Sequence, residues 1–203
     1  MLYKYHSARP FEYLIDIILN NRVWTSLYPD LNDPMEGVYV YRNAGENRDR
    51  VTDALKREKN KVRICSLSIN PDDTLMWSHY ARGHRGVMIG LQVNPQHYDI
   101  RKVEYDGPLA LDGMNLNMVH AIGAREILSH KTEVWNYENE VRVFNTRGYF
   151  VDAKVELVVC GRSMASQEVG MMKRVVKRLN PKIHFLSSPE GFDFVKQEEY
   201  QYA

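Results

Sequence analysis

The chain has 203 residues, of which 44% are hydrophobic and 26% are charged, a balance typical of a folded protein rather than a disordered or fibrous one. Its formal net charge is +1 at pH 7, so no overall field draws it to nucleic acid or to an anionic membrane. A chain of this size builds a core without a disulfide or a structural metal, and we expect one domain over residues 1–203.

The sequence also indicates a compartment. Residues 1–6 lack the apolar stretch of a secretion signal, and the apolar residues 13–19 are interrupted by Asp16 and too short to span a bilayer. Cys65 and Cys160 each lie in an apolar run, where a buried thiol is commoner than a redox pair. We therefore expect a cytoplasmic protein with no membrane partner.

Hydrophobic periodicity and turn residues predict strands and helices interspersed along the chain. In chain order we expect a strand at 2–6, a helix at 11–19, a strand at 22–26, a turn-rich loop at 28–34, a helix at 46–60, a strand at 62–68 and a short helix at 75–80 capped by Asp72 or Asp73. These are followed by strands at 87–91 and 98–105, a helix at 114–130, strands at 137–144 and 155–160, a helix at 165–179 and strands at 183–186 and 192–196. No repeat or linker divides this series, which indicates an α+β or mixed α/β class.

The segment from Trp135 to Phe144 is the most informative in the sequence. In a strand, Val141 and Val143 would share one face, while Glu138, Glu140 and Arg142 would share the other. One interpretation is an amphipathic edge strand with a surface ion pair. The other is a cleft in which one acid binds or activates a substrate hydroxyl and the arginine orients it. The flanking aromatic residues favour the second.

Two further segments carry residues suited to a site. The segment 75–81 holds Trp77, His79 and Tyr80, and core packing is the simplest role for such an aromatic cluster. The loop 31–36 is most simply a capped turn, although Asp33 or Glu36 would alternatively face the same cleft. Zinc-protease, Rossmann and P-loop motifs do not occur in the sequence. The basic residues of the late helix are read as its solvated side or as a patch for nucleic acid.

Taken in order, these segments resemble a bacterial and phage family catalogued as domain of unknown function 2971. The resemblance rests on the opening Leu2-Tyr3-Lys4-Tyr5, on residues 32–36, on residues 76–80 with Gly86, and on Lys131 followed by residues 135–142. It covers nearly the whole chain, because residues 158–161 and the helix after them are also similar to that family.

A looser resemblance is to the ADP-ribosyltransferase superfamily, whose members hold NAD in a cleft between two small sheets. Its three signature positions are a histidine or arginine on the first strand, a tyrosine or serine in the middle, and a glutamate at the start of a late strand. The candidates here are residues 3–6, then Ser66 to Ser68 or Tyr80, then Glu140, with Glu138 completing a Glu-x-Glu pattern. The first strand departs from the pattern, since it offers Lys4 and His6 without a histidine-x-threonine.

The resemblance implies a single compact α+β domain with small mixed or antiparallel sheets forming a cleft, and an enzyme that cleaves the nicotinamide–ribose bond of NAD. Glu140 would hold the ribose and stabilise developing positive charge, and Glu138 would activate an acceptor. Tyr80 is the third candidate catalytic residue. The candidates for contacting NAD are Lys4, Tyr5, His6, Trp77 and Arg142. Arg142 and Lys4 would bind the pyrophosphate or orient the glutamates.

Two alternatives stay open. In the first, the chain is a phosphodiester hydrolase in which four carboxylates bind Mg²⁺ or Mn²⁺: those of Asp33, Glu36, Glu138 and Glu140. In the second, the chain is a non-catalytic recognition module whose charged residues form a structural network. The expected partners are a small nucleotide and a macromolecular acceptor.

Overall fold

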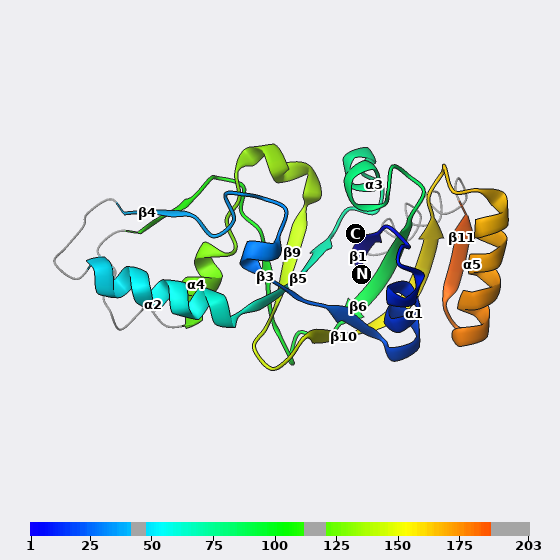
Figure 1. The fold of residues 1–203 in the computed structure, drawn as a ribbon, viewed down its shortest axis with the longest axis horizontal. Coiled ribbons are helices and arrows are strands. Elements are labelled where there is room, and N and C mark those ends of the chain that lie inside the picture. Colours follow the sequence, from blue (N-terminus) through cyan, green and yellow to red (C-terminus); the bar gives the residue numbers. More distant parts are fainter. Residues whose placement is uncertain (42–47, 112–120, 188–203) are drawn as a thin grey trace. The chain divides into compact units, whose positions relative to one another are not determined.

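The computed structural model of the chain describes residues 1–41, 48–111 and 121–187 (Figure 1). Contacts between residues divide the chain into two compact units, each assembled from several stretches of sequence. Unit 1 comprises Met1–Val23, Leu67–Asn94 and Asp152–Ala203, and unit 2 comprises Trp24–Ser66 and Pro95–Val151. Helices and strands are interspersed in both, which confirms the α+β class. Within the described ranges, no helix is long and apolar enough to cross a membrane.

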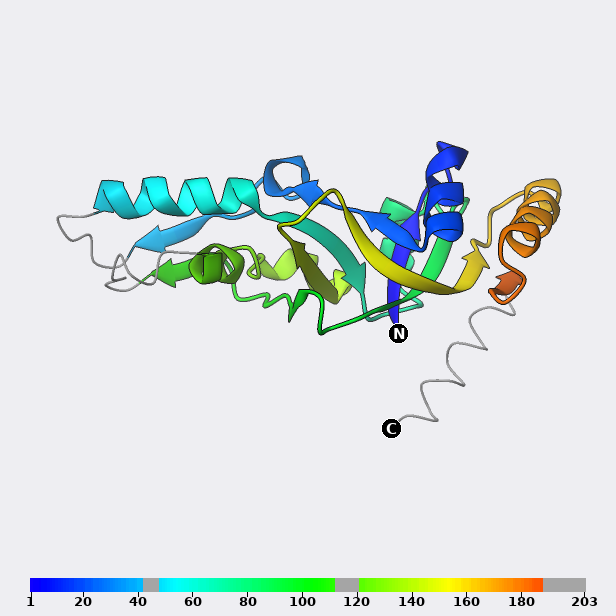
Figure 2. The same ribbon diagram turned by 90° about the horizontal axis from the view of Figure 1, so that it is seen from below.

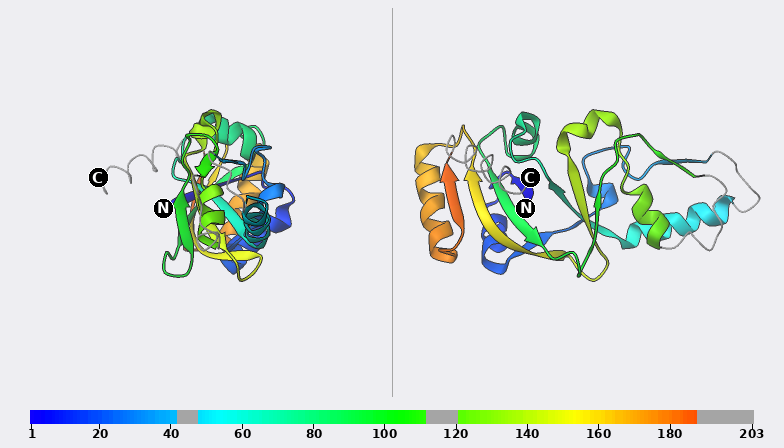
Figure 3. Two further views of the ribbon diagram at one scale, coloured as in Figure 1. Left: turned by 90° about the vertical axis from the view of Figure 1, so that its left-hand side faces the viewer. Right: turned by 180° about the vertical axis from the view of Figure 1, so that it is seen from behind.

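The sheet of unit 1 has the strand order β11-β10-β6-β1. Its strands are β1 (Leu2–His6), β6 (Val87–Val93), β10 (Phe150–Cys160) and β11 (His184–Ser187). Strand β6 is antiparallel to β1 on one side and to β10 on the other, and β11 adds in parallel (Figure 3). The short β2 (Arg22–Trp24) also pairs with β10. Residues Val87 to Leu91 are buried, as expected of an apolar run in a central strand.

Three helices accompany this sheet: α1 (Phe11–Asn20), α3 (Thr74–Tyr80) and α5 (Ser166–Leu179). Helix α1 buries Leu14, Ile17 and Ile18 and is followed by the capping residue Asn21, whose left-handed backbone (φ 49°) suits asparagine. Helix α3 is capped by Asp73, whose side chain accepts hydrogen bonds from two backbone N–H groups of the first turn, so the predicted acidic cap is confirmed. Helix α5 lies against β11 (Figure 1).

The main sheet of unit 2 is built on β5 (Arg63–Ser68), β9 (Glu140–Asn145) and β7 (Asp99–Lys102), with β9 in the middle. The two-residue β3 (Ser26–Leu27) pairs with the first residues of β5, and β7 is antiparallel to β9. A separate parallel pair is formed by β4 (Tyr39–Tyr41) and β8 (Leu109–Leu111).

Helices α2 (Arg48–Lys61) and α4 (Ala121–Ile127) pack on each other in unit 2 (Figure 2). Two short 3-10 helices, η1 (Tyr28–Asp30) and η3 (Glu133–Glu138), complete this unit. Its apolar core has one cluster around Leu55 and Ile127, and a second around Ile64, Leu128 and Phe144.

Two expected boundaries are wrong in a way that bears on the site. The strand predicted for residues 137–144 begins only at Glu140, because residues 133–138 form η3 and Asn139 adopts a left-handed conformation (φ 42°). The predicted helix 114–130 ends at Ile127, and its first residues lie outside the described ranges. The strand expected at 192–196 also lies outside them.

Candidate functional site

Strand β9 places Glu140 and Arg142 on one face, since side chains two residues apart point the same way. Arg142 is 0% exposed and Glu140 is 3% exposed. The expected surface ion pair on an edge strand is therefore wrong: β9 lies between β5 and β7, and both faces of the strand are buried. Two ionised side chains in a buried position require nearly complete pairing, because isolated buried charges are very costly.

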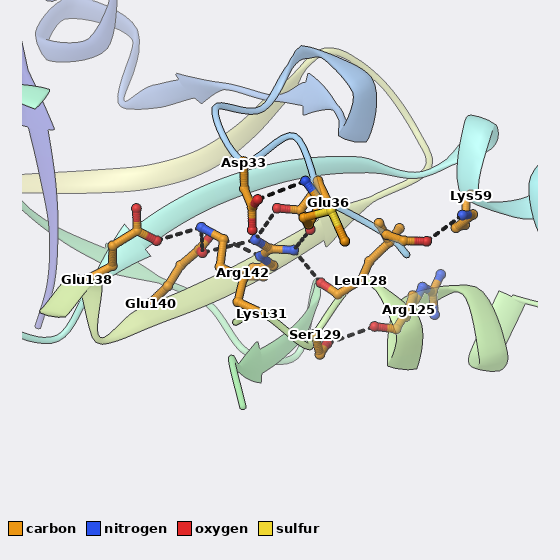
Figure 4. Close-up of polar contacts among 12 residues, drawn as sticks. Asp33, Glu36, Lys59, Arg125, Leu128, Ser129, Lys131, Glu138, Glu140 and Arg142 are labelled. Carbon is orange, nitrogen blue, oxygen red and sulfur yellow. Dashed lines mark hydrogen bonds and ion pairs between the residues drawn. The ribbon is translucent and has the colours of Figure 1, made fainter. Parts of the chain in front are cut away.

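The guanidinium of Arg142 satisfies this requirement in full (Figure 4). Its Nε and Nη2 donate to the two carboxylate oxygens of Glu140, at 2.9 and 3.0 Å. Its Nη1 and Nη2 donate to the two oxygens of Glu36, at 2.5 and 2.9 Å, and Nη1 also donates to the carbonyl of Leu128. All five N–H donors of an arginine are thereby used. Arg142 therefore orients two glutamates and has no donor left for a pyrophosphate.

Glu36 reaches this position from the loop after η1. Asp33, itself buried, accepts a hydrogen bond from the backbone N–H of Met35 through its side chain and one from the Glu36 N–H through its carbonyl. The resulting turn presents Glu36 to Arg142, so this loop combines the two roles expected of it: Asp33 caps the turn and Glu36 faces the charged residues. Beside it, the buried Lys59 donates to the Gly37 carbonyl at 2.7 Å, and burial lowers the pKa of its ammonium, partly opposed by the Glu36 charge.

A second cation, Lys131, joins the group from the segment between α4 and η3. Its Nζ lies 2.5 Å from Glu138 Oε2 and 3.0 Å from Glu140 Oε2, and 5.3 Å from the centre of the Trp135 ring. Burial pulls the pKa of Lys131 down, but the attraction of Glu140 and Glu138 outweighs it, so the pKa is raised. Glu138 thus meets Glu140 through a shared ammonium, although the two do not share a strand.

Four donors surround the Glu140 carboxylate: Nε and Nη2 of Arg142, Nζ of Lys131 and the Ser66 hydroxyl on β5. A carboxylate has about four acceptor positions, so these are all occupied. Burial raises the pKa of Glu140, but the positive charges of Arg142 and Lys131 outweigh that effect and hold the pKa well below its usual range. Glu140 is therefore a fixed anion at any pH near neutrality. Tyr105, which sequence reasoning missed, accepts the Glu140 backbone N–H at its hydroxyl at 2.7 Å.

The remaining predicted contacts lie in unit 1. Trp77 is 1% exposed, with its ring edge-on to Tyr5 at 5.3 Å, so the expectation that it serves the core is confirmed. The Tyr5 hydroxyl donates to the Asn70 carbonyl. Burial, with a smaller effect of Lys4, lowers the pKa of His6 to about 4, so the imidazole is neutral at pH 7 and its Nδ1 accepts the Ala8 N–H. Tyr80 is partly exposed at the end of α3.

The carboxylates do not form the arrangement expected for binding Mg²⁺ or Mn²⁺. Glu36, Glu138 and Glu140 converge, but on the Arg142 and Lys131 cations rather than on a shared open centre. A different group in unit 2, missed by sequence reasoning, has metal-ligand chemistry: one ligand atom each from Glu104, Asp106 and His130 lie within 4.8 Å of one another. There His130 Nδ1 is 2.7 Å from Asp106 Oδ1.

Comparison with curated proteins and with solved structures finds no match. Comparison with family models finds one, over residues 76–143, a range that holds Trp77, Lys131, Glu138, Glu140 and Arg142. Glu36 and the opening strand lie outside it. Over residues 76–143 the chain is similar to the family described as protein of unknown function (DUF2971), in agreement with the resemblance stated from the sequence motifs.

Proposed function

We propose that this chain is an ADP-ribosyltransferase-like enzyme that cleaves the nicotinamide–ribose bond of NAD, with Glu140 as the residue that stabilises the transition state. The observation that carries the proposal is the fixed anion in unit 2: a glutamate at the first position of a late strand, held ionised by Arg142 and Lys131 and hydrogen-bonded by Ser66. Ser66 and Glu140 are the middle and late positions that the superfamily resemblance implies.

The chemistry explains why such an anion is useful. NAD supplies a nicotinamide leaving group and a ribose on which positive charge develops as the bond breaks. A carboxylate whose position and ionisation are set before reaction stabilises that charge without reorganising, which is a large source of catalysis in enclosed sites. Arg142 supports Glu140 in this role through two hydrogen bonds from one rigid guanidinium. Arg142 is thus a positioning residue rather than a ligand of NAD.

A ribose hydroxyl reaches Glu140 only by replacing one of its four donors, and Lys131 is the one best able to leave. Its contact with Glu140 is 3.0 Å, whereas its contact with Glu138 is 2.5 Å. If the contact with Glu140 is broken, the ammonium of Lys131 keeps its contact with Glu138, and its charge remains neutralised in its buried position. Arg142, in contrast, would lose hydrogen bonds to both Glu36 and Glu140 if it moved. We therefore assign Lys131 as the partner that exchanges.

Glu138 takes the acceptor role in this proposal. It lies at the end of η3, one residue before the left-handed Asn139 that separates η3 from β9. Its carboxylate and that of Glu140 both contact Lys131, so a shift of the ammonium toward Glu138 changes the electrostatic potential at both carboxylates. The predicted contacts of Lys4 and Tyr80 with NAD belong to unit 1 and stay predictions.

The test is nicotinamide release from NAD, measured by chromatography at a temperature at which circular dichroism shows each protein folded. The wild type should release nicotinamide, and Glu140→Gln should be slower by roughly two or more powers of ten, the scale of losing one preorganised electrostatic group. Glu138→Gln should impair transfer to an acceptor more than hydrolysis. A wild type that neither releases nicotinamide nor melts at a higher temperature with NAD would contradict the proposal. Stabilisation by Mn²⁺ that is lost in Glu140→Gln would favour the phosphodiester hydrolase instead.

A further inference from the structure

Unit 1 contains a cavity of about 100 Å³ that the proposed function does not use. It is bounded by the loop between β1 and α1, the turn between α3 and β6, and the first two turns of α5 with the residues before it. The apolar part of its wall is formed by Phe11 and by three methionines, Met164, Met171 and Met172. Methionine side chains are flexible and polarisable, and they adapt to small apolar ligands of differing shape.

The polar part of the wall is strongly basic. Arg9, Arg82 and Arg85 all line the cavity, and Glu168 is the acidic residue among the lining side chains. Arg9 Nη2 lies 2.7 Å from Glu168 Oε1, so these two charges compensate each other. In the part of the chain that the structure describes, Arg82 and Arg85 have no carboxylate within ion-pair distance. Among the described residues, these two positive charges beside an apolar wall have no counter-charge.

The turn that carries these two arginines is held in place by its backbone. Gly83 and His84 donate to carbonyls of α3, Gly86 donates to the Ala81 carbonyl at 2.7 Å, and the His84 carbonyl accepts the Ser163 N–H at 2.9 Å. Gly86 also lies so close to β1 that a Cβ there would be 2.2 Å from the His6 carbonyl oxygen. The positions of the arginine backbones are therefore fixed, which lowers the entropy lost when a ligand binds.

We propose that this cavity binds a small amphipathic anion, a carboxylate that carries a short aliphatic chain. The carboxylate matches the guanidinium groups of Arg82 and Arg85, since guanidinium groups bind such planar anions through paired hydrogen bonds. An apolar protein cavity of about 150 Å³ holds benzene, so a volume of about 100 Å³ limits the enclosed chain to about four carbons. Met171 and Met172 contact that chain, and Arg82 and Arg85 contact the head group.

The methionine methyl groups provide a direct readout. Protein labelled with ¹³C at the methionine methyls is titrated with pentanoate, with acetate (the head group alone) and with 1-pentanol (the chain alone). Pentanoate should shift the Met171 and Met172 signals in a saturable way, and acetate and 1-pentanol should bind at least ten-fold more weakly. Signals are assigned by single replacements of methionine with leucine.

Charge-removing variants complete the test. The double variant Arg82→Gln, Arg85→Gln should bind pentanoate at least ten-fold more weakly, while Arg178→Gln, an exposed arginine of α5 outside the cavity wall, should bind as the wild type does. Both cavity arginines are exposed, so the methyl spectrum of the unliganded double variant should stay that of a folded protein. Pentanoate that leaves the Met171 and Met172 signals unmoved, equal binding of acetate, or unchanged affinity of the double variant would each overturn the proposal.

Discussion

Replacing Arg142 with methionine tests the energetic argument for the buried charge network of Glu36, Lys131, Glu138, Glu140 and Arg142. The change keeps an unbranched side chain of similar length but removes all five hydrogen bonds of the guanidinium. Glu36 loses both of the donors that contact its carboxylate oxygens, whereas Glu140 keeps Lys131 and Ser66. A carboxylate is thereby left buried without its ion-pair partner.

The expected cost is about 3 to 5 kcal/mol, the range for removing one partner of a buried ion pair. In a chain of about this length, 1 kcal/mol shifts the melting temperature by roughly 2 to 4 °C, so Arg142→Met should melt about 6 to 20 °C lower. The measurement is thermal and urea unfolding followed by circular dichroism. A second variant, with Glu36→Leu added to Arg142→Met, should recover part of the loss because it removes the stranded carboxylate.

Arg101 supplies a matched control. It is the cross-strand partner of Arg142 on β7 and is also ion-paired, to Asp99 and Glu126, but its side chain is 23% exposed and Glu126 is 49% exposed. Arg101→Met should therefore cost about 1 kcal/mol or less, as is usual for exposed pairs. If Arg142→Met is no more destabilising than Arg101→Met, burial does not make the ion pairs of Arg142 more important for stability than the exposed ones of Arg101.

Three further predictions follow from particular contacts. Trp77→Ala should destabilise the chain by about 3 to 5 kcal/mol, because the ring is fully buried, and an unchanged melting temperature would contradict this. Burial lowers the pKa of His6 from 6.5 to about 4, so the unfolded chain binds the extra proton first as the pH falls. This group contributes stability above pH 6.5 and loses about 3 kcal/mol of it by pH 4, a loss that urea titrations should find missing in His6→Gln. Ser66→Ala should reduce nicotinamide release while leaving the melting temperature within a few degrees, since it removes one of four donors to Glu140; unchanged release would argue against a role for this contact.

Local patterns in the sequence predict much of the fold, because they depend on neighbouring residues. The alternation at residues 2–6, the apolar run at 87–91 and the aspartate before α3 all gave elements that the structure confirms. The error at residues 137–139 has a local cause as well. Charged residues recur at every second position from Glu138 to Arg142, as in a strand, but Asn139 tolerates a left-handed backbone and separates a 3-10 helix from the strand.

The candidate site depends on contacts that a single sequence does not reveal. The spacing of Glu140 and Arg142 is local and predicted a shared face correctly. The pairing of Arg142 with Glu36 joins residues 106 positions apart, and the hydrogen bond from Glu140 to Tyr105 spans 35. One signal was present, since Lys131 was part of the family motif without an assigned role. A lysine close in sequence to two buried glutamates is the kind of counter-charge that burial requires.

The role of Glu140 in the proposed reaction is tested by comparing two variants that each remove a carboxylate from the guanidinium of Arg142. Glu36→Gln and Glu140→Gln each take one ion-pair partner from Arg142, so both should destabilise the chain to a similar degree. Only Glu140 is proposed to stabilise the positive charge that develops on the ribose. With both variants folded at the assay temperature, we predict that Glu36→Gln retains nicotinamide release within about ten-fold of the wild type, whereas Glu140→Gln loses roughly two or more powers of ten. Equal loss in the two variants would contradict the catalytic role proposed for Glu140, because both carboxylates would then serve only the buried charge network.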